Sequence, residues 1–216
     1  PFIVAPSFDV SNIEGQTWIK SILPWAEDED PYVLLRREIG QANKTFALFD
    51  TSTPLGVFWL FREKVQDPER ADLVSPFIEE MRLVKGVEEI NLMKKAGKVI
   101  DSAVMHAFEK ADIGMTEIEM QQLIHNEIVR KSARPTFAAV QFGENSAKPH
   151  AEAGTRELGV GDIVLLDCGC SISGYNTDMT RVAVVGRPSS QQEEVYSIVF
   201  KAQKTALDTI RAGMAC

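Results

Sequence analysis

Apolar residues recur at two different spacings along this chain, and the spacing separates expected helices from expected strands. Between positions 87 and 108 they return every three or four residues, which is typical of a helix with one apolar face. A second helix is expected to begin at Thr116, because Thr116 and Glu119 can form a capping box. Its apolar face would consist of Ile118, Leu123, Ile124 and Ile128. These two helices are the most strongly periodic part of the sequence.

Strands are expected further along. The run at 163–185, IVLLDCGCSISGYNTDMTRVAVV, has the form of an antiparallel hairpin that turns near Ser173-Gly174. It follows a shorter strand at 136–142 and the polar loop GENSAKPH. A last helix is expected after a further capping box, Ser190 with Glu193.

The first part of the chain has shorter and weaker patterns. The apolar runs at 1–6, 32–37 and 45–50 are expected strands, and the stretches 12–23 and 55–64 are expected helices. Strands that alternate with helices indicate an α/β layer. The layer looks incomplete, because the chain opens directly on a strand-like run.

The charged, proline-containing passage QDPERAD at 66–72 is the predicted domain boundary, since it lacks periodic apolar positions. We therefore expect a partial α/β domain over residues 1–72 and a second domain over residues 73–216. The expected fold class of the second domain is α+β.

Composition narrows the function classes. The 216 residues include 23 basic and 31 acidic side chains, a net charge of −8 without a basic cluster, so nucleic acid is not an expected partner. No apolar run approaches the roughly 20 residues that cross a bilayer, and no signal segment opens the chain. Three cysteines are too few for a disulfide framework. The expectation is a cytoplasmic protein that does not bind membranes.

Two carboxylates in the hairpin require an explanation, because ionised groups in an apolar run are costly unless they are compensated. If the hairpin is symmetric about positions 172 and 173, Asp167 lies directly opposite Asp178. Opposite Cβ atoms are about 4.5–5.5 Å apart, so both groups could bind one divalent cation or two neighbouring ones. The alternative is that Asp178 is a turn residue or pairs with Arg181.

Other residue types that carry chemistry have simpler explanations. Cys168 and Cys170 could form a metal or redox pair, but their parity places them on the strand face opposite Asp167. We expect both to be small buried hydrophobes. His150 in the polar loop could be merely exposed, and His106 and His125 are assigned no role.

The motifs together resemble a known family. The order SAKPHAEAG, then LGVGDIVLLDCGCSISGYNTDMTRVAVVGRPSSQQEEVY, then a helix running to AGM, resembles the pita-bread metallopeptidases, which include prolidase, aminopeptidase P, methionine aminopeptidase and creatinase. Upstream, TPLGVFWLFREKV and SPFIEEMRLVKGVEEINLMKKA resemble the domain junction of the prolidase and aminopeptidase P branch. The resemblance implies the first half of a pita-bread catalytic domain behind a partial amino-terminal domain.

The resemblance also implies a chemistry. Asp167 and Asp178 match two of the family's five ligands for two divalent metal ions, which would be Mn, Co or Zn. Thr180 would lie close behind them. His150 matches the family's histidine that binds substrate and stabilises the tetrahedral intermediate. The substrate would be a short peptide with proline at the second position, and the protein would form a homodimer through its amino-terminal domain.

The sequence departs from the family pattern after Asp178. One histidine and two glutamates complete the family's ligand set, and none has a counterpart among the later residues, whose only acids are Glu193, Glu194 and Asp208. We therefore expect an inactive fragment of a longer Xaa-Pro peptidase. The alternatives are a pita-bread binding module without catalysis, and a creatinase-like amidino hydrolase that uses no metal. Retention of both aspartates argues against each alternative.

Overall fold

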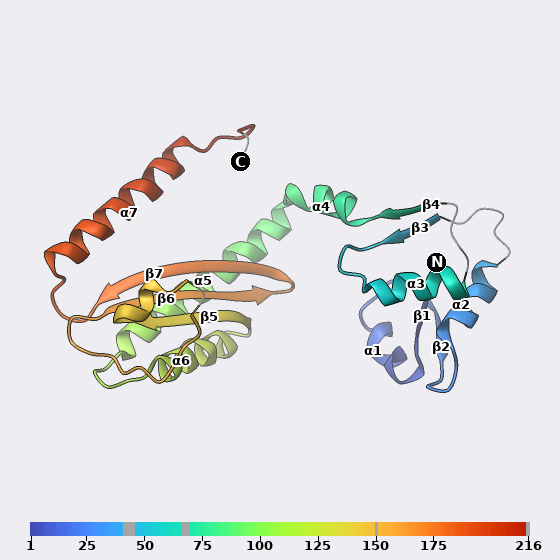
Figure 1. The fold of residues 1–216 in the computed structure, drawn as a ribbon, viewed down its shortest axis with the longest axis horizontal. Coiled ribbons are helices and arrows are strands. Elements are labelled where there is room, and N and C mark those ends of the chain that lie inside the picture. The colour runs from blue at the N-terminus through green and yellow to red at the C-terminus, as the bar shows by residue number, and fades with distance from the viewer. Residues whose placement is uncertain (41–45, 66–69, 150, 215–216) are drawn as a thin grey trace. The chain divides into compact units, whose positions relative to one another are not determined.

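The computed structural model describes residues 1–40, 46–65, 70–149 and 151–214. Contacts divide the chain into two compact units, Pro1–Val84 and Lys85–Cys216, which are coloured blue to green and green to red in Figure 1. No helix in the described ranges has the length and apolar character that a membrane span requires.

The first unit contains two separate pairs of parallel strands with short helices. Strand β1 pairs with β2, and β3 pairs with β4. Phe49 of β3 makes edge-on ring contacts with Phe58 and Phe61 of α3, with centroids 5.1 and 5.6 Å apart. Its elements are β1 (Phe2–Pro6), η1 (Ser7–Asp9), α1 (Val10–Glu14), β2 (Ser21–Trp25), α2 (Pro31–Ile39), β3 (Phe46–Phe49), α3 (Leu55–Lys64), β4 (Arg70–Leu73) and α4 (Ser75–Leu83).

Two predictions for the first unit are wrong. Residues 32–37 form part of helix α2 and not a strand. The reason is a start signal immediately before them: the Asp30 side chain accepts a hydrogen bond from the Tyr32 amide, and Pro31 occupies the first helical turn. The helix expected over 12–23 also fails, since α1 ends before Gly15 and β2 begins at Ser21. Helix α3, by contrast, has the predicted bounds.

The predicted linker at 66–72 overlaps ordered structure. Residues 66–69 lie outside the described residues, but residues 70–73 form β4, which pairs with β3. Along the chain, the boundary between the two compact units follows Val84. The assignment of residues 1–72 and 73–216 to two family domains stays a prediction.

The second unit is a three-stranded antiparallel sheet, in the order β5-β6-β7, with α5 and α6 packed against it. Its elements are α5 (Val87–Lys110), α6 (Glu117–Arg130), β5 (Arg134–Phe142), η2 (Gly143–Ala147), β6 (Ile163–Ile172), β7 (Tyr175–Val184) and α7 (Ser190–Thr209). The core lies between the helices and one face of the sheet, and its largest fully buried side chains include Phe142, Ile100, Met120, Ile124, Ile128 and Leu166. This confirms the α+β expectation for this part of the chain.

The capping boxes fix where two of these helices begin. Thr116 caps α6 as predicted: its Oγ1 accepts from the Glu119 amide at 3.2 Å, and Glu119 accepts from the Thr116 amide at 2.8 Å. The box before α7 is one residue earlier than predicted. There Ser189 pairs with Gln192, at 3.3 and 2.7 Å. The sequence SSQQEE allows a box of Ser189 with Gln192 or of Ser190 with Glu193, so it does not decide between the two.

The hairpin register differs from the symmetric prediction. Ser173 and Gly174 form a two-residue turn with φ of 50° and 84°, the pattern that suits the twist of a hairpin. The strands therefore pair as Ile172 with Tyr175, and Asp167 lies opposite Thr180 while Asp178 lies opposite Gly169. The expectation that the two aspartates are directly opposite is wrong, because the register is shifted by two residues along β7.

Candidate active site

The two aspartates lie on the sheet face that points away from the core. Val164, Leu166, Cys168 and Cys170 are buried, so Asp167, between them, points to the opposite face, where it is half-buried. Asp178 is a diagonal neighbour of Asp167 on the same face, because its own position is two residues from Thr180, which lies opposite Asp167.

The carboxyl groups of the pair are close enough to interact directly. Burial and the charge of Asp167 raise the pKa of Asp178, and a hydrogen bond between the two carboxyl groups acts in the same direction. The Thr180 hydroxyl donates to Asp167 Oδ1 at 2.8 Å, which agrees with the predicted place of Thr180 behind the pair. Two neighbouring carboxylates repel each other when both are ionised, and a bound cation would relieve the repulsion.

Asp178 does not form the alternative ion pair with Arg181, although the structure describes both residues. Arg181 lies opposite Leu166, and its Nη1 donates to the Thr180 carbonyl at 2.9 Å. Arg181 is three residues from Asp178 along β7, so the two side chains leave opposite faces of the sheet.

The aspartate pair fits a divalent cation in charge and donor type, because hard cations prefer carboxylate oxygens. Within the described ranges, no group of three or more histidine, cysteine, aspartate or glutamate side chains is close enough to hold a metal ion. These residues therefore provide two ligands, and a hydrolytic metal needs more than two to fix its geometry.

A hollow of about 910 Å³ opens over the pair. Its polar lining comes from several elements: His125 from α6, Gln141 from β5, and Lys148 and Glu152 from the loop after η2. The remaining lining is mostly small or apolar: Pro135, Thr136, Phe137, Ala138, Ala139, Ala147, Pro149, Ala151, Ala153 and Leu165, with Gln121 and Ser146. The volume and the mixed lining suit a small peptide.

Gly169 is required where the sheet meets this hollow. A Cβ atom at Gly169 would collide with the Phe137 ring and would lie 2.6 Å from the Thr177 carbonyl oxygen. Phe137 pairs with Gly169 on one side, and Asp178 pairs with it on the other. The glycine thus leaves room for an aromatic ring beside the aspartate pair.

The predicted catalytic residue, His150, lies outside the described residues. Its neighbours Pro149 and Ala151 both line the hollow. Sequence reasoning missed His125 and Gln141, which share that hollow. Gln141 could have been found from parity, because it is two residues from Ala139, which lies opposite Asp167. For His125 the sequence carried no such signal, since its place at the hollow depends on how α6 packs.

Cys168 and Cys170 are both fully buried, which confirms the expectation of small buried hydrophobes. Burial raises the pKa of both thiols, and the nearby aspartates contribute for Cys168, which reaches about 12. Neither thiol is available for metal binding on the open face of the sheet.

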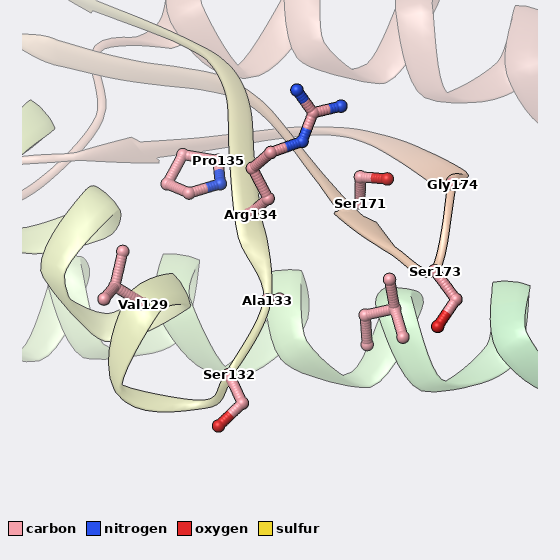
Figure 2. A pocket seen from close by; sticks show the side chains of 9 residues that line it. Val129, Ser132, Ala133, Arg134, Pro135, Ser171, Ser173 and Gly174 are labelled. Carbon is pink, nitrogen blue, oxygen red and sulfur yellow. The ribbon is translucent and has the colours of Figure 1, made fainter. Parts of the chain in front are cut away.

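A second hollow, of about 580 Å³, lies between the start of β5 and the hairpin turn. Figure 2 shows that its polar side chains diverge: the guanidinium of Arg134 points away from the hydroxyls of Ser132 and Ser173. Functional pockets place a few polar groups so that they converge on a ligand. This hollow lacks that arrangement.

The known proteins that this chain is similar to are peptidases. Residues 91–216 match the family model described as Metallopeptidase family M24. An Xaa-Pro dipeptidase from Pyrococcus furiosus is 36% identical over 156 residues, which is 71% of this chain and 44% of that protein. An Xaa-Pro dipeptidase from Lactobacillus helveticus is 27% identical over 99% of this chain and 60% of its own length.

Solved structures show the same likeness over nearly the whole chain. A recombinant prolidase from Thermococcus sibiricus superposes with a TM-score of 0.87 at 30% identity, and the match covers 99% of this chain and 59% of the prolidase. An X-Pro aminopeptidase from Thermotoga maritima gives a TM-score of 0.85 at 25% identity, over 99% and 60% of the two chains. This chain thus spans 44 to 60% of the length of these relatives.

Proposed function

Since this chain belongs to metallopeptidase family M24, we propose that the full-length protein hydrolyses Xaa-Pro peptide bonds with the help of two divalent metal ions. The observation that supports this most directly is the aspartate pair, Asp167 and Asp178, on the open face of the sheet under a peptide-sized hollow. The names of the dipeptidases and the aminopeptidase that this chain resembles give Xaa-Pro peptides as their substrates.

In the proposed reaction, two residues bind metal and one binds the substrate. Asp167 and Asp178 would each contribute carboxylate oxygens to the metal ions, with Asp167 oriented by the Thr180 hydroxyl. Bound ions of this kind, whether Mn, Co or Zn, supply a water of lowered pKa and polarise the scissile carbonyl. His150 would donate a hydrogen bond to the oxygen that becomes negatively charged at that carbonyl.

The proposed substrate is a short peptide with proline at the second position, and the proposed assembly is a homodimer through the amino-terminal part. The buried thiols and the odd number of cysteines favour a reducing compartment, the cytoplasm. A binding module without catalysis would have no reason to retain two repelling carboxylates. The same argument counts against a metal-free amidino hydrolase.

The test is hydrolysis by the full-length protein. We expect release of proline from an Xaa-Pro dipeptide, or of the first residue from an Xaa-Pro tripeptide, only when a divalent metal is present. Asp178→Asn should abolish the activity and lower the metal content. Asp101→Asn, at an exposed position of α5, is the matched control and should leave both unchanged. Activity that survives complete metal removal would contradict the proposal.

A further inference from the structure

A buried carboxamide holds the two sides of the loop at the candidate active site. Gln141 is 5% exposed, and its Nε2 lies 3.0 Å from the Lys148 carbonyl oxygen and 3.2 Å from the Ala151 carbonyl oxygen. The Ala151 amide also donates to the Lys148 carbonyl at 3.3 Å. One side chain therefore binds the backbone on both sides of residues 149 and 150.

A buried carboxylate fixes the same segment at its outer ends. Glu117, in the first turn of α6, is 1% exposed. One of its oxygens accepts from the Phe142 amide at 2.8 Å and from Asn145 Nδ2 at 2.9 Å, and the other accepts from the Gly154 amide at 2.9 Å. These donors precede and follow the 148–151 loop, and the amino-terminal end of α6 also favours the negative charge.

Such an arrangement costs free energy that a hydrophobic residue would not cost, because burial of a carboxamide or a carboxylate must be offset by hydrogen bonds. Gln141 bonds to the backbone of the 148–151 loop, and Glu117 bonds to the backbone before and after that loop, at Phe142 and Gly154, and to the Asn145 side chain. That loop lies at the hollow above the aspartate pair: Gln141, Lys148 and Ala151 line the hollow together with Asp167. Two buried polar side chains, Glu117 and Gln141, therefore bind the backbone beside the hollow, where the position of a loop matters for chemistry.

We propose that Gln141 is a positioning residue that fixes the backbone at Lys148 and Ala151 in the geometry the reaction requires, with Glu117 as the outer support. Gln141 itself does not take part in the chemistry. It acts through residue 150, which lies in sequence between its two acceptors. This inference rests on the proposed function, in which His150 contacts the substrate.

The test is a double-mutant cycle in the full-length protein loaded with metal. Gln141→Met keeps the length of the side chain and removes the donor. We expect kcat for an Xaa-Pro dipeptide to fall about 10- to 100-fold, the range for a misplaced catalytic group, while KM and metal content change little. In the His150→Ala background the same substitution should change kcat less than about twofold, because the two residues act together. Gln122→Met, at an exposed glutamine on α6, is the control and should change nothing.

Hydrogen exchange provides a second readout that does not depend on catalysis. Gln141→Met should accelerate exchange at the Ala151 amide and leave exchange in β6 unchanged. Equal losses of kcat in both backgrounds, loss of metal, or unchanged exchange at Ala151 would each overturn the positioning role. If the unmutated protein shows no Xaa-Pro hydrolysis, the proposed function fails separately, and exchange at Ala151 then decides whether Gln141 holds the loop.

Discussion

The smallest determinant of this site is the absence of a side chain at Gly143. Its φ is +50°, and a Cβ there would collide with the Arg156 guanidinium and lie 2.6 Å from Asp162 Oδ1. Arg156 binds Asp162 and Glu144 with two hydrogen bonds each, at 2.7 to 3.1 Å, and so joins the start of η2 to the turn before β6. Because Gly143 has no Cβ, the backbone that leads to the 148–151 loop can lie directly against Arg156 and Asp162.

We predict that Gly143→Ala lowers the free energy of unfolding by about 2 kcal/mol, through backbone strain and displacement of Arg156. Gly97→Ala in α5 is the control. A Cβ at Gly97 meets nothing within 4 Å, so that change should stabilise by about 0.5–1 kcal/mol, as expected in a helix. Urea unfolding of the three proteins measures both effects. Equal effects of the two alanines would show that Gly143 is not under steric constraint.

A second prediction at this scale concerns His150 in the full-length protein. His150→Ala should lower kcat about 10²- to 10³-fold, as expected for the loss of an oxyanion donor, while metal content stays near that of the unmutated protein. Kinetics and metal analysis of the same preparation separate the possibilities. Loss of one equivalent of metal would identify His150 as a ligand, and full activity would return it to the role of an exposed loop residue.

At the scale of elements, the sequence predicted what depends on local signals. The bounds of α3 and the cap of α6 are correct because periodicity and capping residues are local. The strand at 136–142 was expected two residues late, since β5 includes Arg134 and Pro135. The hairpin register was missed because it depends on two residues, Ser173 and Gly174, that both adopt positive φ. Tertiary packing determined the rest: no sequence pattern shows that α6 places His125 at the hollow.

The observed register leads to a prediction for the aspartate pair. Asp167→Asn in the full-length protein should weaken metal binding and should stabilise, or leave unchanged, the metal-free form, because it removes one of two repelling charges. Calorimetric metal titration and thermal unfolding without metal measure the two effects. A clear loss of stability in the metal-free form would show that Asp167 contributes more through its bond to Thr180 than it costs through repulsion.

The Arg156 cluster should make stability depend on pH. Its hydrogen bonds lower the pKa of Asp162, which is mostly buried, and also that of Glu144. A carboxyl group with a lowered folded pKa stabilises fully above its unfolded value, about 3.9 for aspartate, and the contribution is lost as the pH falls through the folded pKa. The free energy of unfolding should therefore decrease as the pH falls below about 5. Asp162→Asn should flatten this dependence, and an unchanged slope would contradict it.

At the scale of the whole molecule, much apolar surface is exposed. On α7, Val195, Ile198, Val199 and Phe200 are 53 to 62% exposed, and no contact in the described part of the chain buries them. Apolar patches of this kind usually mark contact surfaces.

We predict that this chain self-associates at working concentrations through its amino-terminal part, and that light scattering will give at least the mass of a dimer. The exposed face of α7 is the competing surface. Ile198→Glu should leave the association intact if the amino-terminal part is the interface. A monomer would contradict the prediction, and association that Ile198→Glu abolishes would move the interface to α7.

The turn between β6 and β7 sets a constraint on how this sequence can change during evolution. Side chains alternate between the faces of a strand, so a shift of the β7 register by one residue would turn β7 over and carry Asp178 from the hollow into the core. A shift by two residues keeps the face, and in one direction it would place Asp178 directly opposite Asp167. Homologues can therefore exchange the residues of this turn, but a turn that shifts the register by one residue would separate the two carboxylates as surely as replacement of either one.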